Sequence, residues 1–145
     1  MEKLTIGQLA EASGVHLETI RYYERIGLIR NPPRTASGYR VYETADLARL
    51  RFIRCGRELG FEIEAIRKLL ALQAAPDASC AQARAVTQAH VEAIDTKVKQ
   101  LLWMKEWLLR VMELCPSDAS IDDCPILKAM ACGTDHYAAS TYCSK

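Results

Sequence analysis

The apolar positions near the N-terminus recur at helical spacing in two successive stretches. They predict a short helix over residues 4–13, which Thr5 can cap at its start and Gly14 can end. A second helix is predicted over residues 15–26, with apolar and polar side chains on opposite faces. Two short helices joined by a glycine turn are typical of a helix-turn-helix.

Turn-forming residues follow the second helix. Residues 31–38 are rich in proline, serine and glycine, and residues 39–42 alternate in the manner of a short strand. Together they predict a hairpin, or wing. Two further helices are predicted over residues 44–59 and 63–72, and the segment 74–77 interrupts the helical pattern. We therefore place a domain boundary at this interruption.

One long apolar repeat occupies most of the remaining chain. Between residues 91 and 115 apolar side chains recur at alternating steps of three and four, interrupted only by Lys105, which is typical of a coiled coil, and we expect a helix over residues 82–114. The stripe comprises Val91, Ile94, Val98, Leu101, Leu108, Met112 and Cys115. Such a helix spans roughly 50 Å at about 1.5 Å per residue, and the rest of the chain is too short to cover it. We expect a homodimer, the alternative being a helix that packs on its own N-terminal domain.

Composition narrows the class of protein. Half of the 145 residues are hydrophobic and 26% are charged, which is ordinary for a globular protein and excludes wholesale disorder. No run of about 18 apolar residues is present to cross a membrane, and the first residues lack the apolar stretch of a secretory signal. We expect a cytoplasmic protein with no membrane partner, whose cysteines stay reduced as metal ligands or buried thiols. These six cysteines are Cys55, Cys80, Cys115, Cys124, Cys132 and Cys143.

The net charge of +1 conceals an asymmetry. Residues 1–70 carry 12 Lys and Arg against 9 Asp and Glu, whereas residues 71–145 carry 7 against 9. Eight arginines fall between residues 21 and 54, a density suited to phosphate contacts. They are Arg21, Arg25, Arg30, Arg34, Arg40, Arg49, Arg51 and Arg54. The basic half therefore favours double-stranded DNA as a partner.

Polar and aromatic side chains crowd the start of the second predicted helix, where a recognition helix presents its side chains to base edges in the major groove. The candidate contacts on this helix are Thr19, Arg21 and Tyr22. Contacts with phosphates from the wing would fix the register of the helix on DNA. The candidates there are Arg34, Arg40 and Tyr42.

Several motifs in residues 3–72 closely resemble those of the MerR family of regulators. They are Leu4-Thr5-Ile6-Gly7-Gln8-Leu9-Ala10, Glu18-Thr19-Ile20-Arg21-Tyr22-Tyr23-Glu24-Arg25-Ile26-Gly27-Leu28-Ile29 and Gly38-Tyr39-Arg40-Val41-Tyr42. The resemblance implies a dimer in which a long antiparallel coiled coil separates two DNA-binding heads. It also implies an operator between two promoter elements, where effector binding bends and undertwists the DNA so that RNA polymerase can start transcription.

Cysteines bracket the long helix. Cys80 lies just before its predicted start and Cys115 at its far end, so one chain keeps them apart. An antiparallel dimer brings the start of one helix to the end of the other, where Cys80 of one subunit would join Cys115 and Cys124 of its partner. Eight residues separate Cys115 from Cys124, enough for a loop that turns both thiolates toward one ion. Each dimer would hold two such sites.

Three thiolates with no obvious fourth ligand favour a soft ion. Hg(II) fits best, and Pb(II) and Cd(II) remain open. Zn(II) usually takes four tetrahedral ligands, for which Cys132, His136 or water would have to supply the fourth, and Cu(I) would leave Cys80 without a role. The three cysteines and their Cys-Pro contexts resemble the mercury-binding cysteines of the family's mercuric-resistance regulators, and the family's lead sensors show similar spacing.

Some cysteines and one histidine are left over. Cys132, His136 and Cys143 are additional to the mercury pattern, and we interpret them as incidental to it, the alternative being an auxiliary metal site. Cys55 falls within a predicted helix and is interpreted as a small core residue. His90 is interpreted as a solvated residue of the long helix.

Two other classes of protein also depend on functional cysteines and are alternatives to a metal sensor. A regulator of the same fold can sense oxidation through disulfides or an iron–sulfur cluster, but the tight C-terminal cysteine cluster that such a site needs is missing. A thiol enzyme would need Cys80 or Cys115 as nucleophile beside His90 or His136 as base, and nothing in the sequence brings such a pair together. We therefore expect no enzymatic activity.

The complete prediction is an all-α dominated protein in three parts. Residues 1–74 form a winged helix-turn-helix DNA-binding domain, and residues 75–115 form a linker and a dimerisation helix. Residues 116–145 form a metal-binding loop and a tail.

Overall fold

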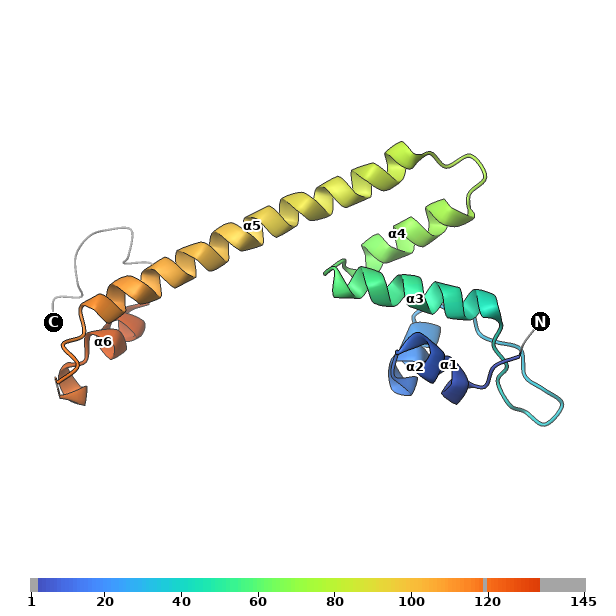
Figure 1. Ribbon diagram of the computed structural model, residues 1–145, viewed down its shortest axis with the longest axis horizontal. Helices are drawn as coiled ribbons and strands as arrows, with labels where there is room; N and C mark the ends of the chain where they lie inside the picture. The colour runs from blue at the N-terminus through green and yellow to red at the C-terminus, as the bar shows by residue number, and fades with distance from the viewer. Residues whose placement is uncertain (1–2, 119, 134–145) are drawn as a thin grey trace. The chain divides into compact units, whose positions relative to one another are not determined.

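The computed structural model describes residues 3–118 and 120–133, so the predictions for His136 and Cys143 lie outside the described residues. The chain divides into two compact units, residues 1–90 and residues 91–145. The first unit contains α1 (Ile6–Ser13), α2 (Leu17–Arg25), α3 (Thr44–Glu58) and α4 (Ile63–Ala74), and α5 (Cys80–Glu113) begins in it (Figure 1). The second unit contains the rest of α5, a single 3-10 turn, η1 (Ile121–Asp123), and α6 (Pro125–Cys132). The predicted all-α dominated fold is confirmed.

Helix α1 begins at Ile6, two residues later than predicted and directly after the predicted cap Thr5, and it ends at Ser13 as predicted. The Thr5 hydroxyl accepts the Gln8 backbone N–H at 3.3 Å, and the Gln8 side chain accepts the Thr5 N–H at 2.9 Å, which completes a capping box. Gly14 ends the helix with φ +67°, a conformation that costs an L-residue roughly 1–2 kcal/mol. Thr5 and Gly14 therefore fix the two ends of this short helix, and Gly14 begins the turn into α2.

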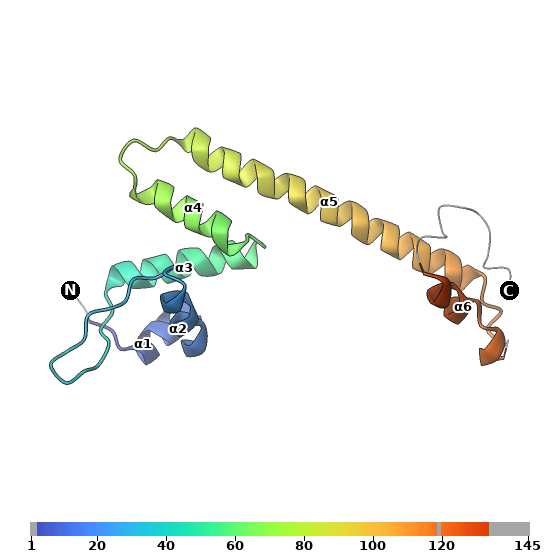
Figure 2. The same cartoon turned by 180° about the vertical axis from the view of Figure 1, so that it is seen from behind.

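The core of the first unit lies where α1 packs on α2 and on α3. Helix α4 packs against the C-terminal part of α3 (Figure 2). Its most deeply buried apolar side chains are Leu9, Ile20, Leu28, Ile29, Leu50, Ile53 and Ile66. These positions come from all four helices and from the turn after α2. Packing of this kind fixes α2 on its apolar side and leaves its polar side exposed.

The wing forms a loop with two isolated bridges and no regular strand among the described residues. Arg34 pairs with Arg40 in an antiparallel bridge, and the Thr35 N–H donates to the Tyr39 carbonyl at 2.8 Å. At the base of the wing, Leu4 and Tyr42 exchange two backbone hydrogen bonds of 2.9 Å. The prediction of a strand over residues 39–42 is wrong because each bridge pairs a single residue, although the predicted hairpin is present.

Helix α5 starts two residues earlier than predicted, at Cys80 instead of residue 82. The Ser79 N–H donates to the Gln82 side chain at 2.9 Å, which is half of a capping box. The pattern Ser79-Cys80-Ala81-Gln82 is the sequence signal of this start. Cys80 therefore lies in the first turn of the helix.

The first three turns of α5 belong to the first compact unit. The His90 ring stacks on Phe61 with centroids 3.9 Å apart, and its Nε2 lies 2.8 Å from the Leu59 carbonyl oxygen. The interpretation of His90 as a solvated residue is wrong because its ring packs on the turn between α3 and α4. The predicted boundary at residues 74–77 coincides with the end of α4, whereas the division into compact units falls after His90.

In the second unit α6 lies alongside the C-terminal part of α5 in both views (Figures 1 and 2). Trp107 and Val111 of α5 are buried, whereas most of the predicted apolar stripe is exposed. Its exposed members are Val91, Ile94, Val98, Leu101, Leu108 and Met112. Helix α6 was not predicted, although Pro125 at its first turn is a helix-start signal. Among the described helices, none has the length and apolar character needed to cross a membrane.

Candidate DNA interface and metal centre

Helix α2 presents the predicted contacts on its outer side. Arg21 and Tyr22 are exposed and Thr19 is partly exposed, while Ile20 and Tyr23 anchor the opposite side in the core. The Arg21 guanidinium pairs with Glu18 at 3.2 Å. An exposed pair of this kind contributes little to stability, so Arg21 can exchange this partner for a nucleic-acid group.

The sequence interpretation counted Arg25 among the arginines suited to phosphate contacts but did not name it with Thr19, Arg21 and Tyr22 as a contact of this helix. Its guanidinium carbon lies 5.9 Å from the centroid of the Tyr22 ring, in the range of a cation–π contact. The spacing of Tyr22 and Arg25, three residues apart on a helix, was the available signal. The pair adds a positive charge next to the exposed tyrosine.

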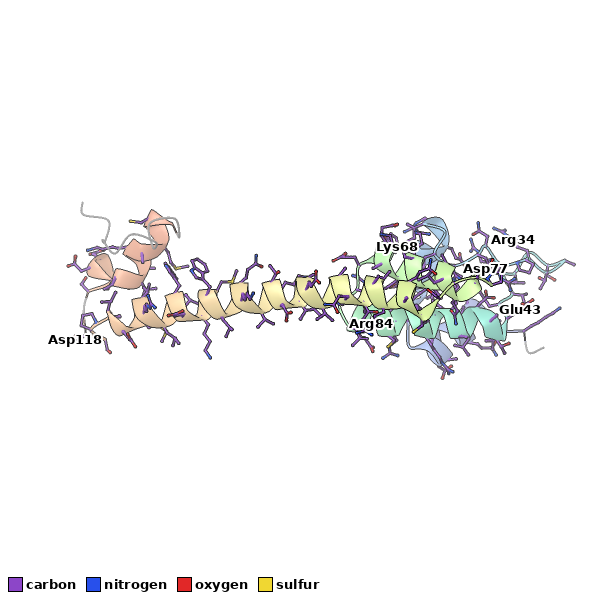
Figure 3. The ribbon with its side chains drawn as sticks, turned by 90° about the horizontal axis from the view of Figure 1, so that it is seen from above. Arg34, Glu43, Lys68, Asp77, Arg84 and Asp118 are labelled. Carbon is purple, nitrogen blue, oxygen red and sulfur yellow. The ribbon has the colours of Figure 1, made fainter. Side chains whose placement is uncertain are left out.

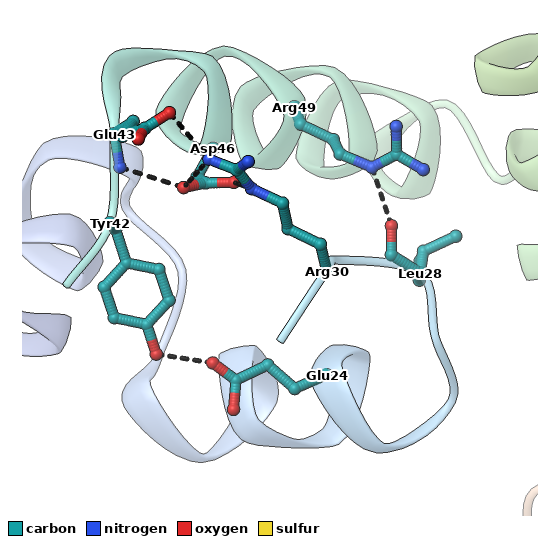
Figure 4. Close-up of polar contacts among 7 residues, drawn as sticks. All are labelled: Glu24, Leu28, Arg30, Tyr42, Glu43, Asp46 and Arg49. Atoms are coloured by element: carbon teal, nitrogen blue, oxygen red, sulfur yellow. Dashed lines mark hydrogen bonds and ion pairs between the residues drawn. The ribbon is translucent and has the colours of Figure 1, made fainter. Parts of the chain in front are cut away.

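Tyr42 lies in the core and does not face solvent, which disagrees with its predicted role in gripping phosphate. Its side chain is 0% exposed, and its hydroxyl donates a hydrogen bond to the buried carboxylate of Glu24 (Figure 4). Arg40 approaches the other oxygen of Glu24, at 3.6 Å. Tyr42 therefore ties the base of the wing to α2.

Replacing Tyr42 with phenylalanine is expected to lower the free energy of unfolding by about 1–3 kcal/mol, because the buried Glu24 carboxylate loses a donor. Burial and the hydrogen bond to Glu24 raise the pKa of Tyr42 above its usual value of about 10. The stability that this phenol contributes is therefore present below about pH 10 and is lost as the pH rises toward its folded pKa. Urea unfolding at pH 7 and above pH 10 measures both effects, and an equal difference at the two pH values would contradict the assignment.

A second polar cluster holds the start of α3 against the segment after α2 (Figure 4). Arg30 contacts Asp46 at 3.1 Å and Glu43 at 2.7 Å, and the Glu43 N–H donates to Asp46 at 2.8 Å. Arg49 donates to the Leu28 carbonyl at 2.7 Å. These contacts fix the chain that leaves α2 and enters the wing.

Three other arginines, like Arg49, donate hydrogen bonds to backbone carbonyls. Arg51 donates to the Ala12 carbonyl and Arg54 to the Ser13 carbonyl, each at 3.2 Å, at the end of α1. Arg67 donates to the carbonyls after α2, at 2.9 Å and 3.2 Å. Four of the eight arginines that the sequence marked as suited to phosphate contacts, Arg30, Arg49, Arg51 and Arg54, therefore already bind acceptors within the head. The last carbonyls of a helix have no partner within the helix, and the arginines at the end of α1 satisfy two of them.

The wing carries the remaining cations of this cluster. Arg34 is exposed on the loop beyond the helices (Figure 3), and Arg40 is partly exposed beside it. Tyr39, which the sequence interpretation did not assign to the site, is 73% exposed between them. The wing therefore offers two cations and one aromatic ring to a neighbouring surface.

The three predicted metal ligands carry free thiols. Cys80 is exposed in the first turn of α5, in the first compact unit. Cys115 follows the last turn of α5, and Cys124 directly precedes α6; both are partly buried in the second unit. Within residues 3–118 and 120–133, no three metal-binding side chains gather in one chain. The three thiols therefore lie on different parts of the described chain, Cys80 in the first unit and Cys115 and Cys124 in the second.

The other described cysteines differ from the predictions. Cys55 is an exposed free thiol on α3, so its interpretation as a core residue is wrong. Cys132 is disulfide-bonded, so the prediction that all cysteines stay reduced is wrong for this residue. A disulfide sulfur is not a thiolate, and in this state Cys132 does not supply a fourth ligand.

Known proteins share both the fold and the order of these elements. Residues 4–73 match the family model described as MerR HTH family regulatory protein, and residues 47–111 match the model described as MerR, DNA binding. The mercuric resistance operon regulatory protein of Bacillus cereus is 41% identical over 128 residues, which are 88% of this chain and 97% of that protein.

Two solved structures extend the likeness to the three-dimensional fold. The transcription regulator PbrR691 from Ralstonia metallidurans CH34, in complex with lead(II), has a TM-score of 0.78 and 31% identity, over 88% of this chain and 98% of that one. MerR from Bacillus megaterium MB1, in complex with mercury(II), has a TM-score of 0.69 and 36% identity, over 88% and 99%. The chain therefore belongs to the MerR family of helix-turn-helix transcriptional regulators.

Proposed function

We propose that this regulator activates a heavy-metal resistance operon when Hg(II) binds to thiolates of Cys80, Cys115 and Cys124. Two copies of the chain form an antiparallel dimer on promoter DNA, and each site takes Cys80 from one subunit and the other two thiolates from its partner. The observation that carries the proposal is the position of three free thiols at the two ends of α5, with no complete site in one described chain.

The donor set supports a soft metal ion. Three sulfur ligands suit Hg(II), and also Pb(II) and Cd(II), whereas Zn(II) prefers a fourth nitrogen or sulfur ligand. The relatives point the same way, because one is named for mercuric resistance and two solved structures hold mercury(II) and lead(II). We place Hg(II) first, since the relative named for mercuric resistance and the structure with mercury(II) share 41% and 36% identity with this chain.

The exposed stripe of α5 supports the dimer. Apolar side chains such as Val98 and Leu101 are 46% and 64% exposed in one chain. Full burial of a wholly exposed side chain of this size gains about 1.5–3 kcal/mol, so covering the exposed part of each gains roughly half as much. A second copy of the helix in antiparallel orientation covers the stripe along its length and brings Cys80 to the opposite end of its partner's helix. Formation of the dimer therefore also brings the three proposed ligands of each metal site together.

DNA contact is assigned to the outer side of α2 and to the wing. The proposed contacts are Thr19, Arg21, Tyr22, Arg34 and Arg40. Two such heads in a dimer hold successive half-sites of the operator, so a change in the angle between the heads bends and undertwists the DNA between them. This change would align the two promoter elements for RNA polymerase. The metal-bound dimer must favour the activating state, or binding shifts nothing.

A competition titration tests the identity of the effector. The reduced dimer is titrated with Hg(II), Pb(II), Cd(II) and Zn(II), and both affinity and transcription in vitro from the promoter upstream of its gene are measured. We expect Hg(II) to activate at the lowest free concentration. Activation by Zn(II) at the lowest concentration, or by none of the four ions, would overturn the proposal. Transcription is the deciding measurement because thiolates bind several of these ions tightly.

Replacing Arg21 with alanine is expected to weaken operator binding by about 1–3 kcal/mol per half-site, with or without metal, because a base-edge contact is lost from α2. Gel-shift titration at fixed salt against an operator selected from random duplexes measures the effect. Arg84→Ala, on α5 and outside the helix-turn-helix and wing, is the matched control. Equal affinities of the Arg21 variant and the unmodified protein would remove Arg21 from the interface.

A further inference from the structure

One side chain of α5 makes a contact with the DNA-binding head that the proposed function does not use. Among the described helices, the pairs that pack extensively are α1 with α2, α1 with α3, and α3 with α4, and α5 is in none of them. In its first three turns, the side chains of Ala83, Val86 and His90 are the partly buried ones, and they lie on one helical face. The attachment of α5 to the head is therefore narrow.

The ring of His90 makes two specific contacts in this attachment. It stacks on the buried ring of Phe61 at 3.9 Å and 28°. Its Nε2 lies 2.8 Å from the Leu59 carbonyl oxygen, and because a carbonyl only accepts, Nε2 carries the hydrogen. Both partners lie in the turn between α3 and α4.

The turn that receives His90 is itself held in place. Gly60 has φ +83°, and a Cβ there would lie 3.7 Å from the His90 ring. The Phe61 carbonyl accepts from Arg57 at 2.9 Å, and α3 continues from this turn into the core beside α1. A force on His90 is therefore transmitted to α3, which carries the helix-turn-helix.

We propose that His90 is a positioning residue that couples Cys80 to the DNA-binding head through the α3–α4 turn. The inference rests on the proposed function, in which Cys80 binds the metal ion. Cys80 and His90 lie ten residues apart on one continuous helix, roughly 15 Å along its axis. Because a helix is stiff over this length, a shift of Cys80 moves the His90 ring, and the stack and hydrogen bond carry the shift to the head.

The test separates coupling from metal binding and from folding. His90→Ala removes both contacts, His90→Phe keeps the stack, and His90→Gln keeps a donor for the Leu59 carbonyl. For each variant we measure Hg(II) affinity by competition, operator affinity without metal, and metal-dependent transcription in vitro. Lys99→Ala, at an exposed position of α5 beyond the first unit, is the matched control.

For His90→Ala we expect activation to fall at least about tenfold, while Hg(II) affinity and metal-free operator affinity stay within about threefold. We expect His90→Phe and His90→Gln to restore part of the activation, and Lys99→Ala to behave as the unmodified protein. Unchanged activation in His90→Ala would overturn the inference. A parallel loss of metal affinity would make His90 part of the metal site, and a parallel loss of metal-free operator affinity would make its role structural; either result also overturns it. If the unmodified protein shows no activation by metal, the proposed function itself fails, and this control distinguishes the two failures.

Discussion

Serine at Cys80, Cys115 or Cys124 is expected to abolish metal-dependent transcription while operator affinity without metal stays within about threefold. The change replaces one sulfur by an oxygen that binds soft ions poorly, so the remaining two thiolates no longer hold the proposed three-coordinate ion. The thiols lie outside α1, α2 and the wing, so the DNA-binding surface keeps its structure. Transcription in vitro and gel-shift titration measure the two properties. Cys55→Ser, which changes an exposed thiol on α3, is the matched control.

A mixed dimer makes the expected result sharper. One chain carries Cys80→Ser and the other carries both Cys115→Ser and Cys124→Ser, and two affinity tags isolate the pair. If each site draws on both subunits, the mixed dimer contains one complete site and one empty site. We expect it to bind one Hg(II) and to regain activation, although neither homodimer responds.

A mixed dimer that shows no activation would contradict the shared metal site. If the three thiolates of one chain bind the same ion, no chain of the mixed dimer contains a full set, and activation stays absent. That result would refute the shared site. Normal activation in any of the three single variants would instead remove that cysteine from the proposed ligands.

Leu101→Asp is expected to raise the dissociation constant of the dimer at least about 100-fold, or about 2.7 kcal/mol. Leu101 is 64% exposed in one chain and lies on the apolar stripe, so the proposed dimer buries it twice. An aspartate there brings an unpaired carboxylate into an apolar seam. Sedimentation equilibrium measures the association, and operator binding should fall with it because two heads bind cooperatively as one dimer.

Gln100→Asp controls for charge, because it adds the same carboxylate at an exposed position next to the stripe. It should leave the association within about threefold. A Leu101→Asp protein that remains dimeric at nanomolar concentration would show that the stripe is not the interface. The shared metal site would then lose its geometric basis.

The helix-turn-helix was predictable because its signals are local. The Thr5 cap, the Gly14 stop and the apolar face of α2 each depend on residues within a turn of one another, and each prediction is confirmed. The long repeat of α5 was equally clear, because its period of three and four persists for many turns. Family membership followed from the same residues, and with it the thiol enzyme considered from the sequence is excluded.

The errors arose where a side chain's role depends on residues far away in the chain. Tyr42 looks like a wing residue locally, but its hydroxyl reaches Glu24, 18 positions earlier. His90 looks solvated on a helical wheel, yet its ring meets Phe61. Periodicity assigns a side chain to one face of an element, but it does not identify the partner that faces it.

The metal site was the least predictable part. Helical spacing alone placed Cys80 and Cys115 at opposite ends of one helix, and only the expectation of a second chain united them. The structure describes one chain, so their assignment as ligands stays a prediction. Helix α6, next to Cys124, was missed because its eight residues carry too short a pattern to distinguish it from a loop.

The arginines that bind carbonyls affect how operator binding depends on salt. Counter-ion release reports only the cations that meet phosphates, with a slope of about 0.9 per contact. Arg49, Arg51 and Arg54 donate to backbone carbonyls within the head, and Arg30 binds two carboxylates. Half of the basic cluster thus contributes to the folding of the head before any DNA is present. The ionic-strength dependence of the complex should accordingly be much shallower than a count of positive residues suggests.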